Sequence, residues 1–169
     1  VTIALIDPPN AGINGSLVIC GSDTNTYDLF TRLNGTPDTG GIWSPALASG
    51  TGIYDPAIDP EGTYTYTVSS GNPACADATA EVMVTLTTPP DAGIDGTLEI
   101  CENDTTLYNL FESLNGTPDT DGFWSPALAS GTGIFDPTVD AEGVYTYRVI
   151  RNPKICPDAT ATVTVTFTP

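Results

Sequence analysis

Apolar and polar residues alternate along several short stretches of the chain, and clusters of Gly, Pro, Asn and Asp separate these stretches. The clearest alternation lies at residues 63–68, where Tyr64, Tyr66 and Val68 fall on one face, and another lies at residues 78–87. A period of two residues is typical of a half-buried β-strand. The pattern therefore predicts an all-β protein with these side chains in its core.

The first half of the chain contains a series of candidate strands, each bounded by turn sequences. They cover residues 16–20, 26–30, 41–43, 52–54, 63–69 and 78–87. Short strands with regular turn signals over a length of about 80 residues predict a β-sandwich.

The chain also repeats itself without gaps at a spacing of 81 positions. Residues 8–88 and 89–169 agree at 51 of these 81 positions, so they are predicted to form two equivalent domains. Residues 1–7 match the end of each repeat and are expected to be the last strand of a preceding repeat or an N-terminal extension. We therefore expect a longer tandem array, and two prolines in the linker at residues 87–93 predict a semi-rigid connection.

The charge balance excludes several classes of function. The chain carries 21 Asp and Glu against four Lys and Arg, with no His, for a formal charge of -17. Such a chain repels nucleic acid and anionic membranes, and no apolar run approaches the roughly 20 residues of a membrane span. Without His it lacks the usual general base, and paired acids have no apolar setting to raise one pKa, so no enzymatic activity is expected.

The four cysteines have two interpretations. Zinc binding is disfavoured because the cysteines are widely spaced, with no CxxC motif and no His. Disulfides are favoured, although four cysteines allow three pairings. Disulfides imply an oxidising, extracellular location.

The run DPEGTYTYTV at residues 59–68, with DAEGVYTYRV at 140–149, resembles the E–F corner of immunoglobulin-like domains. The resemblance implies two tandem immunoglobulin-like β-sandwich domains, with Tyr64 and Tyr145 as tyrosine-corner residues of the core. It places Cys20 at the end of strand B and Cys75 in the F–G loop, at one end of the sandwich. The implied pairing is one intradomain disulfide per domain, Cys20–Cys75 and Cys101–Cys156.

A closer resemblance covers residues 92–167. Their spaced features, including FWSPALASGTGIFDPTVDAEGVYTYRV and CPDATATVTVTF, are similar to the immunoglobulin-like or PKD-like repeats of large Bacteroidota surface proteins, among them gliding-motility-associated adhesins. The resemblance implies a stalk or adhesin module on the outer surface of a bacterium, without catalytic activity. Its expected partners are neighbouring repeats, surface glycans or another cell-surface protein.

Acidic loop residues suggest a Ca²⁺ site at the junction of the repeats, because carboxylates are the ligands that Ca²⁺ prefers. The candidate ligands are Asp59, Glu61, Asp91, Asp95 and Asp104. The alternative is a solvated acidic surface that keeps an exposed array soluble.

The block WSPALASGTGI is identical at residues 43–53 and 124–134 and carries no charge. Trp43 and Trp124 are expected to fill the core, and the alternative is that they present a flat ring to a sugar. The favoured function is a structural spacer of a long extracellular adhesin or filament. The alternatives are a carbohydrate-binding module of a secreted enzyme and a Ca²⁺-rigidified adhesive rod.

Overall fold

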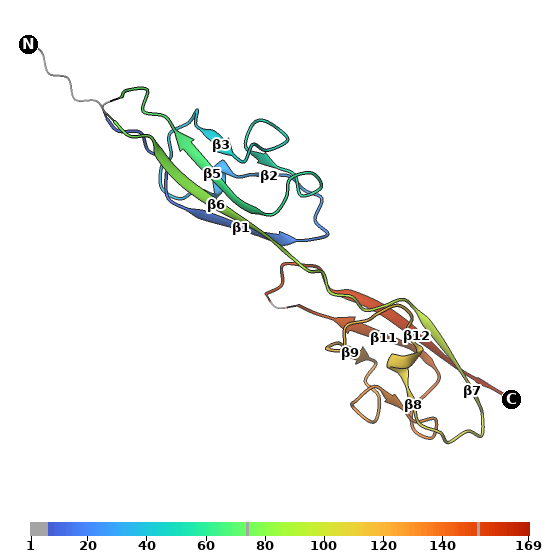
Figure 1. Cartoon of the computed structure of the whole chain (residues 1–169). Coiled ribbons are helices and arrows are strands. Elements are labelled where there is room, and N and C mark those ends of the chain that lie inside the picture. The colour runs from blue at the N-terminus through green and yellow to red at the C-terminus, as the bar shows by residue number, and fades with distance from the viewer. Residues whose placement is uncertain (1–6, 74, 152) are drawn as a thin grey trace, which may run out of the picture. The chain divides into compact units, whose positions relative to one another are not determined.

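The computed structural model describes residues 7–73, 75–151 and 153–169. The chain folds into two compact units, Val1–Thr88 and Pro89–Pro169 (Figure 1). The strand expected within residues 1–7 lies outside the described residues except for Asp7. Each unit is described by itself below.

The first unit places its strands in two sheets. They are β1 (Gly15–Cys20), β2 (Tyr27–Asp28), β3 (Ile42–Ser44), β4 (Ile53–Tyr54), β5 (Gly62–Val68) and β6 (Ala78–Thr87), with a 3-10 turn, η1 (Phe30–Arg32). One sheet has the order β1-β6-β5-β3, and the other pairs β2 with β4. The strands agree with the sequence prediction to within a few residues, and β6 matches it at both ends.

The second unit repeats this arrangement. Its strands are β7 (Gly96–Cys101), β8 (Tyr108–Asn109), β9 (Phe123–Ser125), β10 (Ile134–Phe135), β11 (Gly143–Val149) and β12 (Ala159–Thr168), with η2 (Leu110–Ser113). The larger sheet has the order β7-β12-β11-β9, and β10 pairs with β8. No helix among the described residues is long and apolar enough to cross a membrane.

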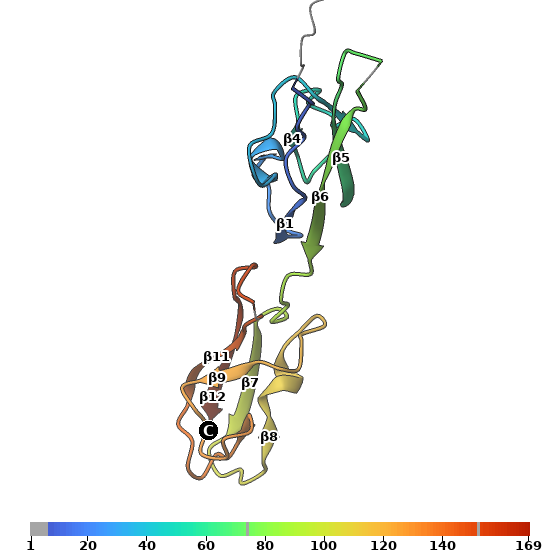
Figure 2. The same cartoon turned by 90° about the vertical axis from the view of Figure 1, so that its left-hand side faces the viewer.

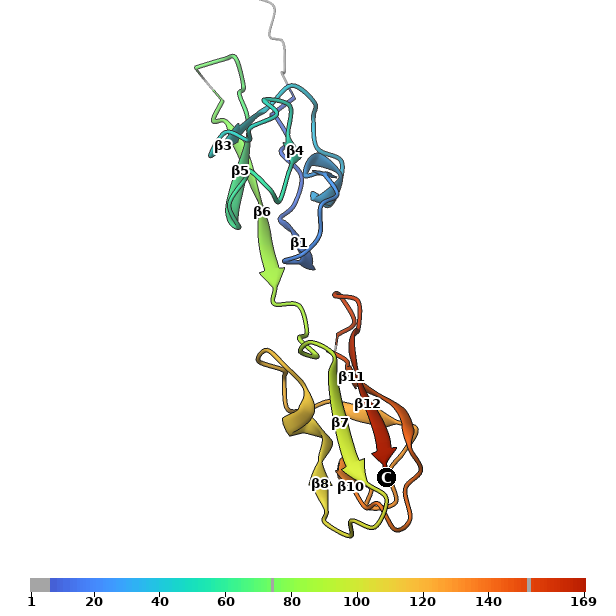
Figure 3. The ribbon, with the colours of Figure 1, turned by 90° about the vertical axis from the view of Figure 1, so that its right-hand side faces the viewer.

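The first and last strands of each unit run parallel to each other. β1 pairs with β6 from Gly15 opposite Val82 to Cys20 opposite Thr87 (Figure 2). β7 and β12 pair in the same way in the second unit (Figure 3). Because the strand that opens a unit and the strand that closes it point in the same direction, the chain enters each unit at one end and leaves it at the other.

The core lies between the two sheets and is built by the alternation that the sequence shows. On β5, Tyr64 and Tyr66 are buried, as are Val82 and Val84 on β6. The smaller sheet and the segments beside it close the core from the opposite side with Leu29, Leu47 and Tyr54. The second unit uses equivalent positions, with Phe135 in place of Tyr54.

The predicted pairing of the cysteines is wrong. Cys75 and Cys101 are free thiols, so neither predicted bond is present among the described residues. The error came from treating the strand before Cys20 as strand B, whereas that strand pairs parallel with the last strand of the unit. Cys20 therefore lies beside the end of β6 and Cys75 shortly before its start.

Candidate functional site

Each unit carries an open groove over its third strand, β3 in the first unit and β9 in the second, and over the loop that follows it. The groove of the first unit has a volume of about 570 Å³ and that of the second about 520 Å³. Both are lined by the Trp, Leu and Gly residues of the repeated block, together with a Phe and a Tyr from neighbouring segments. The chain therefore presents the same groove twice.

Trp43 is half-buried and forms one wall of the groove. Its ring packs on Tyr66 of the neighbouring strand, with ring centroids 5.0 Å apart, and the residue also contacts the core cluster. The indole lies close over Gly52, where an added Cβ would come within 2.6 Å of the indole nitrogen Nε1. Trp43 thus contacts the core, as the first interpretation of the sequence expects. It also borders the groove, as the alternative of a ring presented to a sugar requires.

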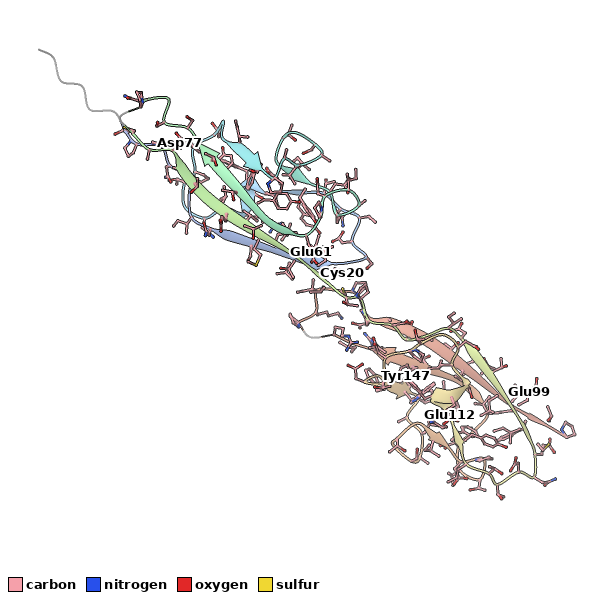
Figure 4. All side chains as sticks on the ribbon, in the orientation of Figure 1. Cys20, Glu61, Asp77, Glu99, Glu112 and Tyr147 are labelled. Atoms are coloured by element: carbon pink, nitrogen blue, oxygen red, sulfur yellow. The ribbon has the colours of Figure 1, made fainter. Side chains whose placement is uncertain are left out.

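Tyr66 forms the floor of the groove, and its side chain is held by hydrogen bonds at the hydroxyl and by a contact at the ring. Its hydroxyl donates to the Asp38 carbonyl oxygen at 2.9 Å and accepts from the Gly41 backbone N–H at 2.8 Å. Phe30 meets the ring edge-on, with centroids 5.4 Å apart. In the second unit, burial raises the pKa of the equivalent Tyr147 above its ordinary value of 10.0. Figure 4 labels Tyr147 in that unit.

The other positions of the repeated block have structural roles of their own. Leu47 is buried, and its carbonyl oxygen accepts from the Gly50 N–H at 2.9 Å. The Ser49 hydroxyl donates to the Ile53 carbonyl oxygen at 2.8 Å, which closes the loop. The peptide bond between Ser44 and the following proline is cis in this unit. The hydrogen bonds and the buried Leu47 therefore give several positions of the identical block a structural role.

The two grooves differ at their rims. Asp28 in the first groove is replaced by Asn109 in the second, and the exposed Ile42 by the exposed Phe123. The first groove therefore carries one more acidic side chain, and the second one more aromatic ring. The Tyr floor, the Trp wall and three of the glycines are the same in both, whereas Gly40 of the first groove corresponds to Asp121 in the second repeat.

The two tyrosines predicted at the E–F corner lie near the start of β5 and β11 and are buried. The Tyr64 hydroxyl donates to the Pro60 carbonyl oxygen at 2.7 Å, and the Tyr145 hydroxyl donates to that of Ala141 at the same distance. Burial is the main cause that raises the pKa of both tyrosines above 10.0. Each ring also meets a core aromatic edge-on, Tyr54 in the first unit and Phe135 in the second.

Asp59, predicted as a calcium ligand, is a buried acid of the first unit at 6% exposure. Its two carboxylate oxygens accept from the backbone N–H groups of Ala48 and Asp55, at 2.8 and 2.9 Å. Glu61, near the end of the unit at which Cys20 lies, accepts from the Leu86 N–H at 3.0 Å (Figure 4). Both acids therefore hold backbone segments of their own unit in place.

The predicted calcium ligands of the second unit do not gather in one place. Asp91 and Asp95 come before β7 and Asp104 after it, so the strand separates them. Asp95 accepts from the Thr162 N–H at 2.7 Å. Hydrogen bonds, first from the Thr106 side chain and then from Tyr108, lower the pKa of Asp104 from 3.8 to about 2. The part of the chain that the structure describes contains no group of three or more acid, His or Cys side chains arranged to hold a metal ion.

Comparison with known proteins identifies the fold. No family model and no curated protein matches the chain. A solved structure of three Ig domains of titin, an E-to-A variant, superposes over 94% of this chain with a TM-score of 0.51 and 16% identity. The fold is immunoglobulin-like. This chain spans 64% of that titin structure. Murine CEACAM1b gives a TM-score of 0.33 at 12% identity, over 80% of this chain and 72% of its own.

Within the immunoglobulin-like fold, the groove is the feature that the sequence analysis did not find. Its signal was present, because the repeated block begins with Trp and ends with Gly-Thr-Gly. Only the fold shows that Gly52 lies under the ring of Trp43 and that Tyr66 completes the floor. Tyr66 comes from β5, more than twenty residues away in the chain, and no local pattern connects the two segments.

Proposed function

We propose that the two immunoglobulin-like repeats are spacer modules of a long extracellular protein and project a binding element away from a cell surface. The presence of a disulfide supports an extracellular location, because such bonds persist in oxidising compartments. The strongly acidic composition suits an array that stays soluble while exposed. The proposal assigns the chain no catalytic activity.

One observation carries this proposal, namely the parallel pairing of the first and last strands in each repeat. It directs the incoming and outgoing chain to opposite ends of the unit. Each further copy then adds length, whereas a unit with both ends on one side would fold back on its neighbour. A ten-residue strand such as β6 spans roughly 33 Å.

The proposal has a specific cellular setting. The resemblance to repeats of Bacteroidota surface proteins favours an array of further copies on the outer surface of a bacterium. Neighbouring repeats are then the principal partners. A surface glycan or a second cell-surface protein would bind the element that the array projects.

The proposal can be tested by measuring length against copy number. Chains with two, four and six repeats are made by joining copies of this sequence, and X-ray scattering gives the maximum dimension of each. We expect each added repeat to increase that dimension by at least about 3 nm, the length of its longest strand. Dimensions that grow with the cube root of mass would show compact packing and would overturn the proposal.

The groove supports a second candidate function, the binding of a carbohydrate. A half-buried Trp over a glycine, beside an exposed apolar residue, offers a flat surface to a sugar ring. Titration of intrinsic fluorescence with oligosaccharides tests this function, with Trp43→Phe and Trp124→Phe variants assigning any change to one groove. A spectrum that stays unchanged at millimolar sugar would remove this candidate.

A further inference from the structure

Three aromatic rings line the groove of the first repeat and pack against one another. The ring of Tyr66 meets both of the others, with its centroid 5.0 Å from that of Trp43 and 5.4 Å from that of Phe30. The face of an aromatic ring attracts a cation that lies within about 6 Å, and it also stacks on the apolar face of a sugar. The groove therefore offers both kinds of attraction in one place.

The acidic side chain in the lining of this groove is Asp28. The residue ends β2 and pairs with Ile53, which directly follows the Gly52 that the Trp43 indole covers. One oxygen of its carboxylate accepts from the Phe30 N–H at 2.9 Å. The other oxygen has no hydrogen-bond partner among the described residues. Asp28 therefore places a negative charge and an open acceptor beside the aromatic rings.

The rest of the lining sets the size and polarity of the ligand. The volume of about 570 Å³ lies in the range of sites that hold small molecules. Thr39 and Thr51 are exposed members of the lining, and a hydroxyl can both donate and accept a hydrogen bond. The groove therefore suits a ligand with an apolar face, several hydroxyls and one positive charge.

We propose that the groove of the first repeat binds an amino sugar, a hexose ring that carries an ammonium group, as part of a polysaccharide outside the cell. The ring stacks on Trp43, its hydroxyls bond to the two threonines, and its ammonium group donates to the Asp28 carboxylate. The formal charge of -17 on the chain favours a cationic polysaccharide over an acidic one. The inference rests on carbohydrate binding, the second candidate function above, and adds the class of sugar.

A lysine-rich peptide carries the same ammonium group but fits the lining less well. The lysine side chain has no ring with an apolar face to stack on Trp43. It also has no hydroxyls to exchange hydrogen bonds with Thr39 and Thr51. The lining as a whole therefore favours the sugar.

The second repeat has the same groove without the carboxylate, because Asn109 takes the place of Asp28. The Asn109 amide oxygen accepts from the Phe111 N–H at 3.2 Å, and its amide nitrogen donates to Glu112 at 3.1 Å. Glu112 is exposed and lies outside the lining (Figure 4). The second groove is therefore expected to bind charged and neutral sugars with similar affinity.

Three tetrasaccharides with the same β-1,4 linkage test the class of sugar, because they differ only at carbon 2 of each ring. The glucosamine tetramer carries ammonium groups there in mildly acidic buffer, the N-acetylglucosamine tetramer carries neutral acetamides, and the glucose tetramer carries hydroxyls. Binding is followed by Trp43 fluorescence in the whole chain with Trp124→Phe, which leaves Trp43 as the single tryptophan. We expect the glucosamine tetramer to bind about five-fold more tightly than either neutral tetramer, the effect of one exposed ion pair. Added salt should reduce this preference.

Two variants show whether Asp28 is the source of the preference. Asp28→Asn removes the charge and keeps the local structure, because Asn109 makes the equivalent bond to the Phe111 N–H in the second repeat. This variant should bind the glucosamine and glucose tetramers equally. Glu81→Gln removes an exposed acid of the same repeat that lies outside the groove, and it should keep the five-fold preference. An equal loss in both variants would show non-specific attraction to an acidic chain and would overturn the inference.

The other outcomes separate the inference from the function on which it rests. Three tetramers that bind the unmodified groove with equal affinity would contradict the amino sugar and leave carbohydrate binding in place. A Trp43 signal that responds to none of them would remove carbohydrate binding, and the inference with it. A tetralysine peptide that binds as tightly as the glucosamine tetramer would show that the ammonium group alone is recognised, which would also contradict the inference.

Discussion

At the scale of single residues, Gly52 determines how the groove is built. It has a φ of +87°, and the ring of Trp43 lies directly over it. A side chain at this position would strain the backbone and also push the ring away. Gly133 has the same role under Trp124.

Gly52→Ala should therefore destabilise the first repeat by more than Gly50→Ala. Gly50 also has a positive φ, at +69°, but nothing lies within 4 Å of its added Cβ. Backbone strain costs about 1–3 kcal/mol at either position, and Gly52→Ala adds the displacement of the indole. Urea unfolding followed by Trp43 fluorescence, in a Trp124→Phe background, measures both. Equal losses would show that the indole does not depend on Gly52.

Two core tyrosines, Tyr54 and Tyr64, provide a second test at this scale. The Tyr64 hydroxyl donates to Pro60, whereas the buried Tyr54 hydroxyl has no hydrogen-bond partner among the described residues. Tyr64→Phe should lower the free energy of unfolding by about 1 kcal/mol, and Tyr54→Phe should leave it unchanged or raise it. The second repeat already carries Phe135 at the position of Tyr54. A larger loss for Tyr54→Phe, in thermal or urea unfolding, would contradict this assignment.

At the scale of elements, the strands could be predicted from the sequence and their pairing could not. The alternation at residues 78–87 located β6 correctly at both ends, because side-chain periodicity is a local property. The partner of β1 is set by contacts more than sixty residues away. No local pattern indicates that β1 runs parallel to the last strand, and the wrong pairing of the cysteines followed from this gap.

The acids that the sequence offers as calcium ligands in the second repeat hold elements of their own unit. β7 lies between Asp91 and Asp95 on one side and Asp104 on the other, and each of these acids accepts a hydrogen bond within the second repeat. Because these acids already stabilise their own loops, we expect the melting temperature to be the same in millimolar Ca²⁺ and in EDTA. A rise of several degrees with Ca²⁺, absent with Mg²⁺, would contradict this expectation and support the calcium hypothesis.

At the scale of the whole molecule, sequence identity between the repeats was the most informative signal. It located both copies and indicated the equivalence of Cys20 with Cys101 and of Cys75 with Cys156. It could not show which cysteines bond, because that depends on the end of the sheet at which each one lies. Once the direction of β1 is known, a bond within one folded repeat is excluded on distance.

In the whole molecule, the chain crosses each of the two repeats from one end to the other. Single-molecule pulling on the two termini tests it most directly. With reductant, we expect two similar unfolding steps of about 25 nm, since 81 residues extend to about 28 nm and each folded repeat spans a few nanometres.

The two steps should be of similar length, because the two compact units contain nearly the same number of residues. A single step of about twice this length would contradict this arrangement, because it would show that the two repeats unfold as one body.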